Sequence, residues 1–246
     1  MNIRFTIGIL CATCCLLAAS PRPVQSKQSF TSDILFFGDS LTAMVNWQQA
    51  FPEYQVINEG VPGDTTKTAN QRLKQILQKQ TPRTMFIMLG INDLFQNPPL
   101  HVPARAESYL NKQCPAAKKL LKYSVNKGNA LYWSLVAIPR GANSYTSLLK
   151  TIRSQSPDTR IFVQSILPTN DNIFYRNHQF QIGAKTILSF NKRVKRIAAA
   201  QHLEFIDLYP YLTKNNELNP DFTGDGVHLN EAGNRIWCNE IRKHVR

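Results

Sequence analysis

Residues 34–42, Ile-Leu-Phe-Phe-Gly-Asp-Ser-Leu-Thr, decide the fold class of this chain. A short apolar run ends at Gly38-Asp39-Ser40, and a helix-compatible segment from Leu41 to Ala50 follows directly. An apolar run of this length before a glycine turn is typical of a buried parallel strand. A serine at such a turn lies at the carboxyl edge of the sheet, where ligands bind in open α/β folds. On this stretch alone, a capping role for Asp39 or Ser40 at the following helix explains the residues as well as a functional role does.

Four more apolar runs have the length of buried strands, at 54–57, 84–89, 160–167 and 203–208. Amphipathic segments separate several of them and predict helices after Thr65, over 187–198, and from 231 with Asn230 as its cap. The first of these helices is expected to bury Ala69, Leu73, Ile76 and Leu77 and to carry Lys67, Arg72, Lys74 and Lys79 on its other faces. Alternation of strands with helices predicts an α/β fold whose parallel sheet is covered on both faces.

Polar, glycine-bearing turns follow three of the five predicted strands. They contain Ser40, Gly60 and Asn92, and a fourth polar loop holds Asp225 and His228. Since the carboxyl ends of parallel strands meet at one sheet edge, we expect these turns to lie together. A serine, a histidine with an acid three residues before it, and nearby hydrogen-bond donors are the parts of acyl-transfer chemistry.

With these four turns, the chain resembles the SGNH (GDSL-type) hydrolases. Four segments of the chain match the four sequence blocks of this family, in the same order. They are Gly38-Asp39-Ser40-Leu41-Thr42, Asn58-x-Gly60-x-x-Gly63-x-Thr65-Thr66, Gly90-x-Asn92-Asp93 and Asp225-x-x-His228-Leu229. The resemblance implies a flavodoxin-like three-layer α/β/α sandwich with a five-stranded parallel sheet. The absence of a Gly-x-Ser-x-Gly motif argues against the α/β-hydrolase arrangement.

The resemblance also implies a role for each matching residue. Ser40 would be the nucleophile, His228 the general base and then acid, and Asp225 the residue that orients His228. The oxyanion hole would be formed by the backbone N–H groups of Ser40 and Gly60 and by the side-chain amide of Asn92. This chemistry needs no metal and no cofactor, so none is expected.

Other residues compete for these roles on sequence grounds. Four further histidines are present, but only His228 combines an aspartate at −3 with a following helix; the others are His101, His178, His202 and His244. Asp39 and Asp93 are expected to brace their turns. The segment from Asp221 to Gly226 resembles the start of a calcium loop, but its twelfth position is Ala232 instead of glutamate.

The amino-terminal 26 residues have the pattern of a secretory signal peptide, with Arg4 before an apolar stretch and a cleavage site after Ser26. We therefore expect export, to the periplasm or out of the cell, of a hydrolase domain spanning 27–246. A lipoprotein or an uncleaved membrane anchor is the alternative. Cleavage would leave Cys114 and Cys238, which could form one disulfide or remain two separate thiols.

The segment 97–142 is interpreted as an insertion into the family pattern. It contains seven Lys or Arg and one acidic residue, in a chain whose formal net charge is +13. A basic helix is predicted over Pro115 to Val125, and an apolar aromatic run extends from Leu131 to Ile138. The segment is either a lid or docking element, with an anionic envelope surface as its partner, or a packed decoration. No nucleic-acid recognition module is visible, so nucleic acid is not an expected partner.

The sequence thus predicts an exported serine esterase that removes short acyl groups, with acetyl favoured, from a carbohydrate or a lipid. The same residues would serve a lysophospholipase, a thioesterase or an O-acyltransferase, and a catalytically inactive envelope-binding protein is the alternative from another class. The sequence carries no signal for an oligomeric state.

Overall fold

A computed structural model of the chain describes residues 30–95, 115–178 and 182–245. The predicted signal peptide, the first part of the insertion and Cys114 lie outside these residues. Five strands form one parallel sheet in the order β2-β1-β3-β4-β5, which confirms the predicted fold class. Their bounds are β1 Ser32–Gly38, β2 Val56–Gly60, β3 Pro82–Met88, β4 Arg160–Gln164 and β5 Glu204–Ile206.

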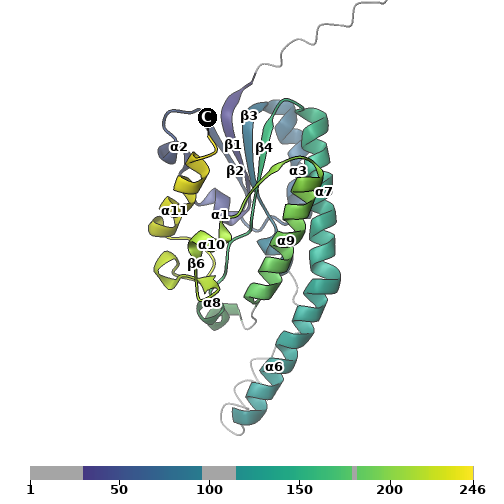
Figure 1. Cartoon of the computed structure of the whole chain (residues 1–246), viewed down its shortest axis with the longest axis vertical. Helices are drawn as coiled ribbons and strands as arrows, with labels where there is room; N and C mark the ends of the chain where they lie inside the picture. Colours follow the sequence, from purple (N-terminus) through teal and green to yellow (C-terminus); the bar gives the residue numbers. More distant parts are fainter. Residues whose placement is uncertain (1–29, 96–114, 179–181, 246) are drawn as a thin grey trace, which may run out of the picture.

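Helices cover both faces of the sheet (Figure 1). One layer contains α3 (Thr66–Lys79), α7 (Ile138–Gln155) and α9 (Ala184–Ala200), and the other contains α1 (Ser40–Ala43), α2 (Trp47–Ala50) and α11 (Glu231–Arg242). The predicted helices after Thr65, over 187–198 and after Asn230 are thereby confirmed. Shorter elements border the carboxyl edge: α4 (Ile91–Phe95), α8 (Asp171–His178), α10 (Tyr209–Leu212), the hairpin of β6 (Thr213–Lys214) and β7 (Glu217–Leu218), and η2 (Pro220–Phe222).

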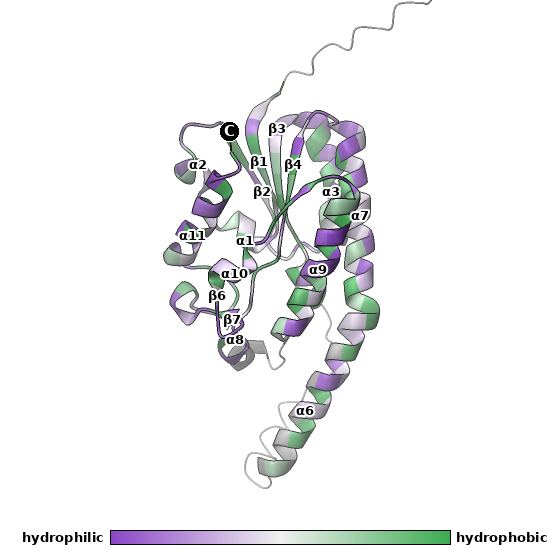
Figure 2. Cartoon of the chain, in the orientation of Figure 1, coloured by the Kyte–Doolittle hydropathy of each residue, from purple (hydrophilic) through white to green (hydrophobic). Residues whose placement is uncertain are grey.

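An aromatic row crosses the middle of the sheet. Phe36, Phe86 and Phe162 are register partners on adjacent strands, and their ring centroids are 5.2 Å and 4.8 Å apart. Trp47 of α2 stacks on Phe36 at 3.6 Å, and Trp237 of α11 meets Trp47 edge-on at 4.9 Å. Strand β1 is mostly hydrophobic, whereas the covering helices mix both kinds of residue (Figure 2). The core is therefore centred on β1, the strand that leads into Ser40.

The prediction of one helix from Leu41 to Ala50 is wrong, because α1 ends at Ala43 and α2 begins at Trp47. The interruption exposes Met44, whose relative exposure is 59%, while Val45 stays buried. Asn58 of β2 stabilises the break, since its side-chain amide donates to the backbone carbonyls of Thr42, Ala43 and Val45. These bonds satisfy carbonyls that a continuous helix would have used internally.

The described part of the insertion is helical and has no loop at its end. Helix α6 (Pro115–Tyr132) continues through a π-helical turn, η1 (Trp133–Ala137), directly into α7, so the predicted end at 142 falls inside a helix. Pro139 follows the π turn; proline has no N–H to donate, and such a residue commonly distorts the preceding turn of a helix.

Helix α6 projects beyond the body of the protein at the carboxyl edge of the sheet (Figure 1). Trp133 anchors its base, because the ring is 1% exposed and its N–H donates to the Leu94 carbonyl at 3.0 Å. Leu131 and Leu135, by contrast, are exposed. The apolar run is thus split between a buried and an exposed face. Over the described residues, no helix has both the length and the apolar character needed to cross a membrane.

Candidate active site

Ser40 lies where strand β1 passes into helix α1. Asp39 caps this helix, as its Oδ1 accepts the Leu41 N–H at 3.0 Å, and Ser40 is the first helical residue. The cap is therefore Asp39, which leaves the Ser40 hydroxyl available for another partner. Gly38 is required by space, since a Cβ there would lie 2.0 Å from Thr42 Oγ1 and 2.7 Å from the Met88 carbonyl oxygen.

The structure brings His228 and Asp225 to Ser40 from the other end of the chain. Ser40 Oγ lies 2.9 Å from His228 Nε2, and His228 Nδ1 lies 2.6 Å from Asp225 Oδ2. The second carboxylate oxygen of Asp225 accepts the backbone N–H groups of Val227 and His228, both at 2.8 Å. These four contacts fix the carboxylate and the imidazole in one hydrogen-bonded line with the serine.

The pKa of Asp225 is shifted by two opposing effects. Partial burial raises it, but the hydrogen bonds from the His228 ring and from the Val227 and His228 N–H groups outweigh burial and lower the pKa of the carboxyl. Asp225 is therefore an anion at neutral pH, as a residue that orients a histidine and stabilises its protonated form must be.

A cavity of about 230 Å³ opens onto this line of residues. Its lining includes Ser40, His228 and Asn92, together with the apolar side chains Phe95, Phe174 and Val227. The rings of Phe95 and Phe174 stack with centroids 4.8 Å apart and form an apolar wall. Neither phenylalanine was predicted for the site, because neither residue belongs to a family block.

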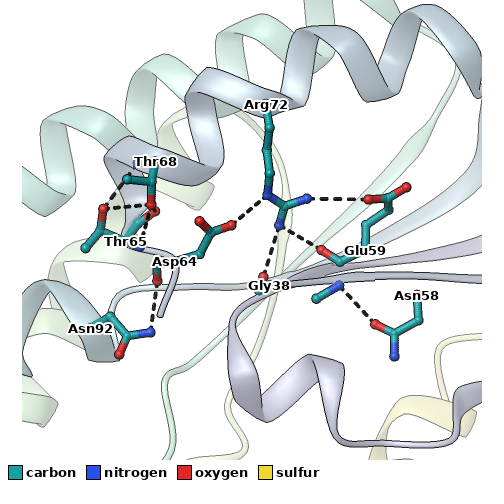
Figure 3. Close-up of polar contacts among 9 residues, drawn as sticks. Gly38, Asn58, Glu59, Asp64, Thr65, Thr68, Arg72 and Asn92 are labelled. Atoms are coloured by element: carbon teal, nitrogen blue, oxygen red, sulfur yellow. Dashed lines mark hydrogen bonds and ion pairs between the residues drawn. The ribbon is translucent and has the colours of Figure 1, made fainter. Parts of the chain in front are cut away.

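Asn92 of α4 reaches the cavity while remaining tied to the second polar turn. Its Nδ2 donates to the backbone carbonyl of Asp64 at 3.0 Å (Figure 3). An amide nitrogen has two hydrogens, so one remains for a ligand in the cavity. Asp93 was expected to brace its own turn, but it accepts instead from Thr66, whose N–H and hydroxyl donate to it at 2.8 and 2.7 Å.

The prediction that the Gly60 N–H serves the oxyanion stays a prediction. In this structure the N–H donates to the side-chain oxygen of Asn58 at 3.0 Å, two residues before it. Gly60 does not line the cavity described above either. A Cβ at Gly60 would lie 2.3 Å from the backbone nitrogen of Ala43, so glycine is required by the close passage of α1 over the end of β2.

Arg72 is the residue that the sequence interpretation misplaced. It was expected on an outer face of its helix, but its side chain is only 21% exposed and its guanidinium contacts Gly38, Glu59 and Asp64. The only signal in the sequence was the presence of acidic residues in the preceding turn.

The competing residues lie elsewhere. His202 ends the turn after α9, His244 pairs with Glu204, and His178 is the last residue of α8. His101 lies outside the described residues. Within the part of the chain that the structure describes, no group of three or more His, Cys, Asp or Glu side chains is placed to hold a metal ion. Cys238 is a free thiol, and burial raises its pKa to about 11.

The sequence profile of the GDSL-like lipase/acylhydrolase family matches residues 36–236. The chain belongs to this family. It is accordingly an ester hydrolase. Three of the four sequence blocks lie at or directly after the ends of β1, β2 and β3, and the fourth lies in the loop before α11. A search of curated proteins found no match.

Solved structures with the same fold include several GDSL-type enzymes. A GDSL-like lipase from Bacteroides thetaiotaomicron superposes with a TM-score of 0.59 at 20% identity, covering 87% of each chain. The acetyl xylan esterase AlAXEase gives a TM-score of 0.60 at 17% identity, over 87% of this chain and 100% of that one. A mutant of Axe2, an acetylxylan esterase from Geobacillus stearothermophilus, gives 0.58 at 19% identity, over 89% and 96%.

Proposed function

We propose that this GDSL-family ester hydrolase removes short acyl groups, with acetyl favoured, from a carbohydrate or a lipid, using Ser40, His228 and Asp225. The observation that carries the proposal is the hydrogen-bonded line from Ser40 Oγ through the His228 ring to Asp225, which opens onto a cavity. A nucleophile, a base and an orienting carboxylate in this geometry are what acyl transfer through a serine ester requires.

Each group has a defined task in the reaction. With its Nδ1 proton held by Asp225, His228 presents the Nε2 lone pair to Ser40 and takes the hydroxyl proton as Oγ attacks the ester carbonyl. Collapse of the tetrahedral intermediate passes that proton to the departing alcohol and leaves an acyl-serine. Water, deprotonated by the same imidazole, then releases the acid and restores Ser40.

The proposed oxyanion donors are the N–H groups of Ser40 and Gly60 and the side-chain amide of Asn92, and the geometry of Ser40 and Asn92 supports this role. The Ser40 N–H belongs to the first residue of α1, a position that has no acceptor within the helix. The Asn92 amide lines the same cavity. Removing one such donor costs enzymes about 10²–10³ in kcat.

The preference for short acyl groups follows from the small size of the cavity. About 230 Å³ is below the usual range of about 300–1,000 Å³ for sites that enclose drug-sized ligands. The stacked rings of Phe95 and Phe174 provide an apolar wall for a methyl group. The likeness of fold to two acetyl xylan esterases supports an acetylated carbohydrate as the first substrate to test.

Export remains part of the proposal. It rests on the signal-peptide pattern of residues 1–26, and the basic insertion offers a contact with an anionic envelope surface. Expression of the full chain with and without residues 1–26, followed by fractionation, tests it; retention of the full chain in the cytoplasm would contradict it.

The function is tested with p-nitrophenyl esters of two to sixteen carbons beside O-acetylated xylan. We expect fastest turnover of the acetyl ester, its loss in Ser40→Ala, and unchanged turnover in Ser154→Ala, a control at an exposed serine of α7. Preference for long chains would favour a lysophospholipase or thioesterase, and acyl transfer to an added alcohol in preference to water would favour a transferase. Failure of a fluorophosphonate to label Ser40 would favour the alternative of a catalytically inactive envelope-binding protein.

A further inference from the structure

Arg72 lies in α3, outside all four sequence blocks, yet its guanidinium sits at the carboxyl ends of β1 and β2 (Figure 3). Its Nη2 donates to the backbone carbonyls of Gly38 at 3.2 Å and Glu59 at 2.8 Å. Its Nε donates to Asp64 Oδ2 at 2.6 Å, and its Nη1 lies 3.5 Å from Glu59 Oε2. The group also lies over the Phe37 ring, 4.4 Å from its centroid. One planar cation therefore joins the last residues of two strands to the turn that follows the second.

Each of these contacts leads to a group of the proposed site. Gly38 is two residues before Ser40, so a hydrogen bond to its carbonyl helps to fix the position of the turn that carries the Ser40 hydroxyl. Asp64 is held through its side chain by Arg72, and through its backbone carbonyl it accepts the Asn92 amide at 3.0 Å. Only one residue, Asp64, separates the guanidinium from Asn92.

We propose that Arg72 is a positioning residue that sets the separation between Ser40 and the Asn92 amide. This inference rests on the proposed function. The donors that meet an oxyanion must be placed to within a fraction of an ångström, and displacement by about 1 Å can cost about 10²-fold in rate. Strand β1 and turn 61–64 belong to different parts of the chain, and α4 to a third. A planar guanidinium with several N–H donors is suited to holding the strand end, the turn and, through Asp64, the helix in fixed positions.

A purely structural role for Arg72 makes a different prediction. If the guanidinium only stabilised the packing of α3 on the sheet, its loss would lower the melting temperature and affect every measure of activity alike. If it positions Asn92, its loss lowers kcat while KM stays nearly constant, because the interaction affected is made in the transition state. The effect also disappears when Asn92 is already absent.

The test is a double-mutant cycle of wild type, Arg72→Gln, Asn92→Ala and the double variant, with p-nitrophenyl acetate as substrate. We expect Arg72→Gln to lower kcat about 10- to 100-fold with KM within about threefold, and to lower it less than about threefold when Asn92 is alanine. Arg72→Lys should fail to restore kcat, since an ammonium cannot engage the same set of acceptors. The matched control is Arg83→Gln, at an exposed arginine paired with Asp33 at 3.8 Å.

A second measurement separates this proposal from the function on which it rests. The side-chain amide signals of Asn92 in a ¹⁵N–¹H spectrum should shift or broaden in Arg72→Gln and stay in place in Arg83→Gln. If wild type neither turns over esters nor labels with a fluorophosphonate, the proposed function fails, and the Asn92 signals still decide the role of Arg72. Unmoved Asn92 signals, or equal losses of kcat in both backgrounds of the cycle, would overturn the positioning role.

Discussion

Replacement of Asp39 by asparagine should raise the free energy of unfolding, relative to wild type, by more at pH 8 than at pH 4. The difference arises because the buried aspartate ionises as pH rises and asparagine does not. Asp39 is fully buried beside Ser40, and its Oδ2 has no hydrogen-bond partner among the described residues. Burial raises the pKa of this carboxyl from 3.8 to about 7, with smaller contributions from the charges of Asp64 and Asp93. The folded protein therefore favours the neutral acid.

The sign and the size of the effect follow from proton linkage. Between about pH 4 and pH 7 the unfolded chain has lost the Asp39 proton while the folded chain keeps it, so the free energy of unfolding falls as pH rises. The window spans about three pH units at about 1.4 kcal/mol each, which gives about 4 kcal/mol of stability lost by pH 8. Asparagine retains an oxygen that can accept the Leu41 N–H and cannot ionise, so this loss is absent from the variant.

The assay is urea unfolding of wild type and Asp39→Asn at intervals from pH 4 to pH 8. The informative quantity is the difference between the two proteins at each pH, because titration of the remaining groups cancels in it. That difference should grow by about 4 kcal/mol in favour of asparagine across the range. Asp158→Asn, at an exposed aspartate in the turn before β4, is the control and should differ from wild type by a constant amount. Parallel curves for wild type and Asp39→Asn would refute the reasoning.

Three further substitutions test other parts of the structure. Asp225→Asn should lower kcat by about 10⁴, since the amide no longer holds the His228 tautomer, and steady-state kinetics with Asn172→Ala as a neutral control would show it. Gly90→Ala should destabilise the fold by about 3 kcal/mol, because φ is +127° and a Cβ would lie 2.2 Å from the Phe190 ring. Gly183→Ala, also at positive φ but in open space, should cost about 1 kcal/mol, and urea unfolding measures both. Trp133→Ala should cost about 3–5 kcal/mol and loosen the base of α6, whereas Leu135→Ala, at an exposed leucine two residues further on, should be nearly neutral in thermal unfolding. Equal effects within either of the last two pairs would contradict the packing on which they rest.

The sheet could be predicted because its strands are apolar runs that need no distant partner to be recognised. Phe36 and Phe37 are buried on opposite faces of β1, so the run lacks the alternation of a surface strand and its length gives the strand directly. The pairing of His228 with Asp225 could be predicted because the two residues are three positions apart on the same loop. Both signals lie within a few neighbouring residues.

The features that were missed depend on contacts between distant parts of the chain. The break between α1 and α2 is stabilised by Asn58, more than ten residues away, and propensity within Leu41–Ala50 carries no record of it. Helical periodicity correctly places Arg72 next to the buried face of α3. Periodicity cannot say, however, that its long side chain turns back over the sheet edge to Asp64 and Glu59.

Gly60 shows why a motif position does not by itself establish a chemical role. Two physical demands meet at the ends of β1 and β2: the backbone of α1 must pass close to the strand, and donors must face the cavity. Gly60 meets the first demand, since any side chain would strike Ala43, and its N–H is used by Asn58. Asn92 meets the second, and it does so while bonded to Asp64. A glycine in a family block therefore marks close packing of backbone as readily as it marks an anion donor, so its place in the motif does not by itself establish which of the two roles it has.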